Sequence, residues 1–173
     1  MATFYQYLLA IIFALIQSAY IIVKGYFLSI EFTLYPYLIK NNFTPYKDIV
    51  DQHFPSLFFG FFSLPLLSQK SHIPLLVLLL GLNFFSGLLL YRYLLHSGSK
   101  KATLHTAIYL IIMSYFSANI LWVEIFINFI IVLTLNLDSK KNTFFGYLIG
   151  FLLFQVILMR PTLILTVLVL SLY

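Results

Sequence analysis

The sequence from Ile73 to Leu95 is IPLLVLLLGLNFFSGLLLYRYLL, an apolar run that contains one charged residue, Arg92. A helix of about 20 such residues crosses the roughly 30 Å hydrocarbon core of a bilayer, because it rises about 1.5 Å per residue. The run therefore predicts a transmembrane helix, and Phe4–Val23 predicts another by the same argument. With 62% hydrophobic, 19% aromatic and only 9% charged residues, the whole chain has the composition of an integral membrane protein.

The loop between these two predicted helices, residues 24–72, holds three of the five acidic residues. Its segment Phe32–Ile39 is apolar and aromatic but too short to cross, which is typical of a helix lying in the membrane interface. Phe54–Leu67 would reach only about 21 Å as a helix, and Pro65 interrupts its end. We expect a second juxtamembrane helix there that does not cross the bilayer.

The C-terminal half contains a third apolar block, residues 106–137, which is too long for one crossing and short for two. If the lysine pairs on either side of it, at 100–101 and 140–141, share the cytoplasmic face, the block must be a hairpin of 106–119 and 120–137. We then expect a span over 144–159 and an unfinished one over 161–173. The sequence thus predicts an all-α, polytopic transmembrane bundle that forms a single domain, 1–173, and is a fragment of a longer chain or the product of a truncated gene.

Charge sets the expected orientation and excludes one class of partner. Basic residues are concentrated in the short loops around Lys100 and Lys140, which places these loops in the cytoplasm and the loop 24–72 outside. Four of the five acids then lie at the outer face: Glu31, Asp48, Asp51 and Glu124. The net charge of +5 does not indicate nucleic acid, because the basic residues are scattered between apolar runs and form no continuous face for a phosphate backbone.

Several segments, taken in order, resemble a known family. Glu31 directly after the first span, the segments 35–48 and 51–55, and the late segment 146–162 are similar to the N-terminal module of integral membrane glycosyltransferases of the GT-C fold. The resemblance is to the branch that uses polyprenyl-phosphate sugars, such as the dolichyl-phosphate-mannose transferases, and it covers most of the chain. Two features differ from that family, which commonly has Asp where Glu31 stands and whose members are several hundred residues long.

The resemblance implies an inverting transferase that moves a sugar from a polyprenyl-phosphate donor to a glycan, lipid or protein acceptor. It implies an acid at the membrane face after the first span, two juxtamembrane helices in the first outer loop, and a second acid in the next outer loop. Glu31 and Glu124 match these two acids. The expected location is a prokaryotic cell membrane, with the active face extracytoplasmic.

The chemistry of such a transfer assigns a role to each candidate residue. Displacement at the anomeric carbon needs a base for the acceptor hydroxyl and positive charge on the departing phosphate. Glu31 suits the first task, with Asp48, Asp51 and Glu124 as further catalytic candidates. The cationic candidates for substrate binding are Lys47, His53 and Arg160. No cofactor is required by this chemistry, although His53 with a carboxylate leaves a divalent metal ion open.

Each candidate also has a plainer interpretation. Glu31 is also explained as a solvated charge at a helix boundary, and Asp51 as the cap of a helix that starts near Phe54. Arg160, before a proline, is equally suited to anchoring a helix at the interface. Buried amides and glycines are typical of helix packing in bilayers, a role we expect for Gly81, Asn83, Gly87, Asn119 and Asn128.

The alternative to a transferase is a small non-catalytic membrane protein, either half of a transporter or an accessory subunit. A transporter is expected to hold its ionisable residues near the middle of the bilayer, whereas a transferase gathers them at one face. The predicted clustering at the outer face favours the transferase.

Overall fold

The computed structural model describes residues 2–29, 31–49, 73–116, 118–137 and 143–171. The described chain is mostly helical, as the sequence predicts, and it divides into two compact units. The first unit comprises residues 1–27 and 73–136, and the second comprises residues 28–72 and 137–173. The predicted juxtamembrane helix at Phe54–Leu67 lies outside the described residues.

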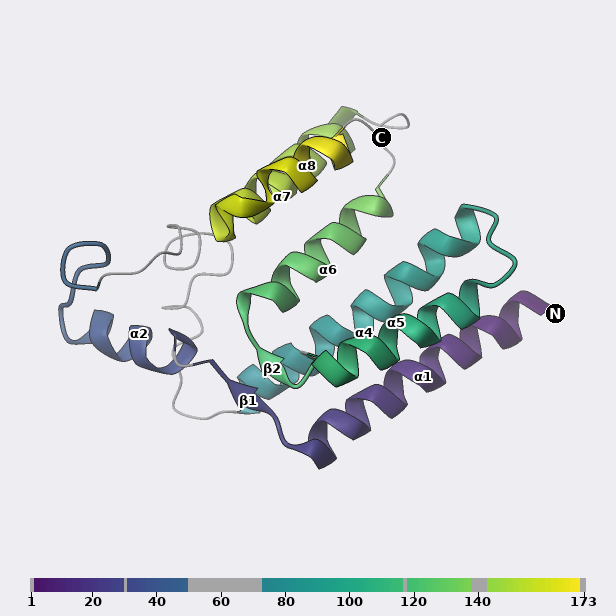
Figure 1. Ribbon diagram of the computed structural model, residues 1–173, viewed down its shortest axis with the longest axis horizontal. Helices are drawn as coiled ribbons and strands as arrows, with labels where there is room; N and C mark the ends of the chain where they lie inside the picture. Colours follow the sequence, from purple (N-terminus) through teal and green to yellow (C-terminus); the bar gives the residue numbers. More distant parts are fainter. Residues whose placement is uncertain (1, 30, 50–72, 117, 138–142, 172–173) are drawn as a thin grey trace. The chain divides into compact units, whose positions relative to one another are not determined.

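The first unit consists of four helices whose chain direction reverses from each to the next (Figure 1). They are α1 (Ala2–Lys24), α4 (Ile73–His96), α5 (Ala102–Phe116) and α6 (Val123–Leu135). α4 packs against each of the other three, and α1 also packs against α5. The predicted block 106–137 corresponds to α5 and α6, and the described residues 118–122 belong to the segment between them.

Two of these helices, at Phe4–Lys24 and Ile73–His96, are long and apolar enough to cross a membrane. Only 22% and 33% of the residues in their most apolar stretches are buried, so most of these residues are partly buried or exposed. α5, α6 and α7 are apolar but shorter, between 10 and 17 residues.

A stripe of small and polar residues brings α1 close to its neighbours. The buried residues of α1 are Ala10, Ala14, Gln17 and Ile21, which recur every three or four positions and so lie on one helix face. At the far end of this stripe the Tyr7 ring meets the Tyr91 ring of α4 edge-on, with centroids 4.9 Å apart. Small side chains let helix backbones approach closely, which is how helices pack where no water is available to drive association.

The loop between α4 and α5 is short and tightly hydrogen-bonded. The Gly98 N–H donates to Leu95 O and the Ser99 N–H donates to Leu94 O, both at 3.0 Å. This pair of bonds is a Schellman motif, and it requires the left-handed backbone that Gly98 adopts, with φ of +76°. The helix therefore stops abruptly at His96, and the chain turns directly into α5.

The second unit contains α2 (Glu31–Lys40) and, far along the chain, α7 (Thr143–Met159), the 3₁₀ turn η2 (Pro161–Leu163) and α8 (Ile164–Ser171). α7 packs against α8 and η2, so these elements form a helical hairpin. A short strand, β1 (Phe27–Leu28), connects the two units and pairs with β2 (Ile120–Leu121).

Candidate functional site

The first predicted catalytic residue, Glu31, is the first residue of α2. This helix covers the predicted interfacial segment Phe32–Ile39 and ends at Lys40. Its end is a second Schellman motif: the Asn42 N–H donates to Ile39 O and the Phe43 N–H to Leu38 O, each at 3.1 Å. Asn42 holds the left-handed position, with φ of 66°, which asparagine tolerates better than most residues.

The segment after α2 is a compact loop in which Asp48 has a structural contact. The Asp48 carboxylate accepts a hydrogen bond from the Thr44 N–H at 2.8 Å, and Thr44 O accepts the N–H groups of Lys47, Asp48 and Ile49. The side chains of Lys47 and Asp48 are exposed, whereas Ile49 is buried. Asp48 therefore closes its own loop, and Lys47 projects from that loop into solvent.

Two predicted site residues, Asp51 and His53, lie outside the described residues. Their roles as catalytic acid, helix cap, phosphate partner or metal ligand stay predictions. Among the residues that the structure does describe, no three His, Asp or Glu side chains are grouped as a metal site would require.

Glu124 occupies the first turn of α6, directly after the reversal of the chain. The residue before this helix, Trp122, provides no side-chain cap, although its carbonyl accepts the Ile125 N–H at 3.1 Å. A carboxylate in a first turn is favourable because the N-terminal end of a helix carries partial positive charge. The Glu124 side chain is half-buried. Its place in the first turn stabilises α6 whether or not the carboxylate also takes part in catalysis.

Arg160 lies where α7 turns into η2. Its N–H donates to Val156 O at 2.9 Å, and its carbonyl accepts the Leu163 N–H at 3.0 Å. The side chain is exposed. Lys47, Asp48, Arg160 and the start of α2 belong to the second unit, whereas Glu124 belongs to the first. The sequence also predicts that Glu31 and Glu124 approach each other at the outer face, with residues 44–55 folded over the space between them, and this stays a prediction.

At one end of the first unit, the segment that precedes Glu31 is hydrogen-bonded to the segment that precedes Glu124. The Phe27 N–H donates to Asn119 O at 2.7 Å, and the Asn119 side chain donates to Gly25 O at 3.1 Å. The Lys24 ammonium reaches Ser114 O at 3.5 Å. The end of α1 is thereby tied to the segment that joins α5 to α6.

Amide side chains hold the helices of this unit together, as the sequence predicts for some of them. The Asn83 amide donates to Ala118 O at 3.1 Å and to Leu79 O at 2.9 Å, while the Asn128 amide donates to the Tyr109 hydroxyl. A Cβ at Gly87 would approach the Leu110 side chain to 2.9 Å, so this glycine marks a close contact.

Gly81 lacks the packing role that the sequence predicts, and two further amides that the sequence analysis did not single out bond to neighbouring helices. At Gly81 a Cβ would meet no atom within 4 Å, so no neighbour requires a glycine there. The buried Gln17 amide donates to Leu110 O at 3.1 Å, and the Asn136 amide donates to Leu89 O at 2.9 Å. An amide placed within or at the end of a long apolar run was the available signal for both.

No protein-family model, curated protein or solved structure matches this chain.

Proposed function

We propose that this chain is a polytopic membrane protein and forms the N-terminal part of a GT-C-like glycosyltransferase that uses a polyprenyl-phosphate sugar. The membrane location is supported by the two long apolar helices and by their outward-facing apolar side chains. The transferase assignment is supported by the order of segments that resembles this family and by the contacts that follow.

The observation that carries the proposal is the hydrogen bond from the Phe27 N–H to Asn119 O. Glu31 follows Phe27 by roughly four residues and Glu124 follows Asn119 by roughly five, so the chain limits each acid to about 14–18 Å from this contact. Because α1 and α5 both end here and α6 begins here, the proposal places the two acids at one membrane face. A lipid-linked donor keeps its reactive bond at that depth.

In this proposal Glu31 accepts the proton of the acceptor hydroxyl as that oxygen attacks the anomeric carbon. The bond from the anomeric carbon to the phosphate oxygen breaks, and the polyprenyl phosphate departs with the electron pair. Lys47, Arg160 and His53 are the cationic groups proposed to stabilise that phosphate, because fixed positive charge favours the developing negative charge. Glu124 is proposed to orient the acceptor.

The test is consumption of radiolabelled polyprenyl-phosphate sugars by the full-length gene product in vesicles. Glu31→Gln keeps the size and hydrogen-bonding capacity but removes the base, so turnover should fall about a hundredfold or more. Lys40→Gln, at the other end of the same helix, is the matched control and should keep turnover within about twofold of wild type. Full turnover in Glu31→Gln, or no consumption of any sugar donor by the wild-type protein, would refute the transferase.

One contact and one position in a helix favour the second candidate, a non-catalytic membrane subunit. The Asp48 carboxylate closes its own loop, and Glu124 stands at the favourable end of α6. Both acids therefore have structural uses that need no substrate. An inactive full-length protein that copurifies with a membrane partner, and whose partner is lost on truncation of α2, would support this candidate.

A further inference from the structure

One end of the first unit carries all but one of its basic residues and no acid. Arg92 lies near the end of α4, Lys100 lies in the turn, and Lys101 immediately precedes α5. The sequence 73–116 contains no Asp or Glu, and His96 and His105 are the other titratable groups at this end besides tyrosines. We call Arg92, Lys100 and Lys101 the basic end.

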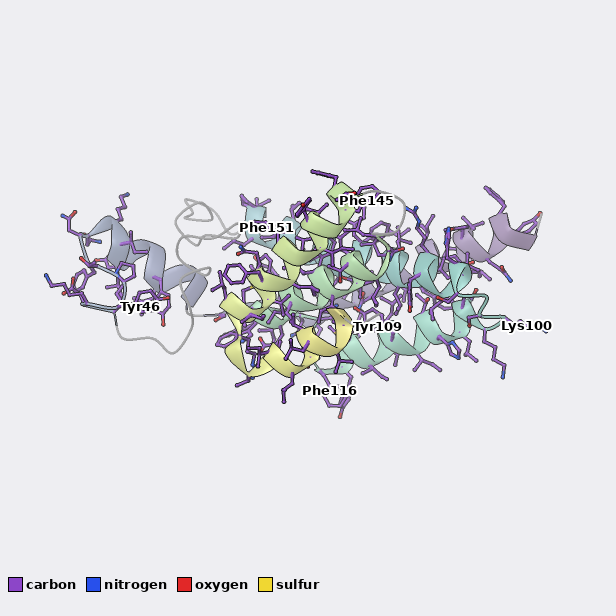
Figure 2. The ribbon with its side chains drawn as sticks, turned by 90° about the horizontal axis from the view of Figure 1, so that it is seen from above. Tyr46, Lys100, Tyr109, Phe116, Phe145 and Phe151 are labelled. Atoms are coloured by element: carbon purple, nitrogen blue, oxygen red, sulfur yellow. The ribbon has the colours of Figure 1, made fainter. Side chains whose placement is uncertain are left out.

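The three cationic side chains of the basic end are exposed. The polar groups around them are used locally: the His96 ring contacts Arg92 O at 2.9 Å, and the Ser99 hydroxyl contacts the His105 ring at 3.4 Å. The structure gives the three cations no ion pair with any described residue. Figure 2 shows Lys100 in the turn at one end of the first unit.

The loop holds these charges close to apolar surface. The two bonds of the Schellman motif at Gly98 fix the turn, so Lys100 cannot move far from the end of α4. The contact between Tyr7 and Tyr91 brings the start of α1 to the same end, and there Phe4 and Tyr5 are 70% and 60% exposed. Exposed aromatic rings beside cations are typical of the headgroup layer of a membrane.

We propose that the basic end binds the phosphate groups of anionic phospholipids in the leaflet that it faces. An anionic phospholipid is the expected occupant because its phosphate complements the three cations and because the turn directly follows an apolar helix. This inference rests on the proposed membrane location and is independent of glycosyl transfer. It assigns Arg92, Lys100 and Lys101 a direct contact with lipid phosphate.

The absence of cysteine from the sequence permits a clean test. Ser97→Cys, labelled with bimane, places a fluorophore in the turn, and Tyr26→Cys places one at the opposite end of the unit as a spatial control. The protein is reconstituted in phosphatidylcholine vesicles that contain increasing fractions of nitroxide-labelled phosphatidylglycerol or nitroxide-labelled phosphatidylcholine. Quenching at each fraction gives the relative association constant of the two lipids.

At position 97 we expect phosphatidylglycerol to be preferred by about fivefold or more, because each basic residue near an anionic surface contributes roughly that factor. The triple variant Arg92→Gln, Lys100→Gln, Lys101→Gln should reduce the preference to about one. Salt at about 0.5 M should weaken it through screening. At position 26 we expect a smaller preference, because that end of the unit carries one cation, Lys24, in place of three. Lys24→Gln should leave the preference at position 97 unchanged.

Three outcomes would overturn the proposal. One is equal quenching by both lipids at position 97, and another is an unchanged preference in the triple variant. The third is displacement of phosphatidylglycerol by millimolar inorganic phosphate but not by chloride of the same ionic strength, which would indicate a site for a soluble anion. Flotation of the vesicles verifies insertion separately, so that failure of the membrane location itself is distinguished from failure of lipid recognition.

Discussion

Asn83 shows how a single side chain can join two helices in apolar surroundings. It is buried in α4, and its amide bridges the carbonyls of Leu79 and Ala118, the latter beyond the end of α5. A carbonyl that loses its donor in hydrocarbon has no water to replace it. Hydrogen bonds between helices in bilayers contribute from a few tenths to about 2 kcal/mol.

At this scale we predict that Asn83→Ala destabilises the protein by about 1 kcal/mol. Asn41→Ala is the matched control, because the Asn41 amide donates to Tyr37 O one turn away in an exposed position. The control should change stability by less than about 0.5 kcal/mol. Thermal unfolding in detergent measures both, and equal stability of the two variants would mean that the bond to Ala118 contributes nothing.

For the helices α1 and α4, the sequence predicts the ends as well as the apolar runs. Apolar length predicts α1 and α4 closely, because hydropathy is a local property of the sequence: the predicted spans 4–23 and 73–95 have nearly the same bounds as the helices. Position in an apolar run marks Gln17 and Asn136 as packing amides, but their acceptors, Leu110 O and Leu89 O, could not be predicted because they lie on other helices. Of the candidate site, the sequence predicted the short helix over Phe32–Ile39, which in the structure begins at Glu31. The closing of the loop by Asp48 depends on the folded backbone at Thr44 and could not be predicted.

Gly98, at the end of a helix, and Gly81, inside one, give a paired prediction about backbone conformation. A Cβ would meet no atom within 4 Å at either position, so only the backbone distinguishes them. Gly98→Ala forces a side chain into the left-handed region and should cost about 1 kcal/mol. Gly81→Ala lies inside α4 and should stabilise the protein by about 0.5–1 kcal/mol. We expect the unfolding midpoint to fall in Gly98→Ala and to rise in Gly81→Ala. Shifts in the same direction would contradict the argument from backbone conformation.

For the whole first unit, the reversals of the chain sort the loops into two ends. The starts of α1 and α5 and the last turn of α4 share one end, as the contact between Tyr7 and Tyr91 indicates. The end of α1, the end of α5 and the start of α6 share the other, where Phe27 binds Asn119. If the unit spans a bilayer, its cations at the basic end predict that this end is cytoplasmic.

Cysteine labelling tests this arrangement in sealed vesicles. Tyr26→Cys and Phe116→Cys should react with an impermeant thiol reagent from one side, and Ser97→Cys should react from the other. The sequence adds that Ser68 shares the side of Tyr26, because Phe54–Leu67 is predicted not to cross. Labelling of positions 68 and 97 from the same side would exclude α4 as a transmembrane helix.

The amide bonds between helices also have a mechanical consequence. Gln17 fixes α1 along the axis of α5, and Asn83 fixes α4 against the chain that leaves α5. A displacement of one helical turn, about 5.4 Å, would break such a bond and leave the buried amide donor without its acceptor. The helices of the first unit therefore resist sliding along one another. We expect any large displacement during function to occur in the segments attached to this unit.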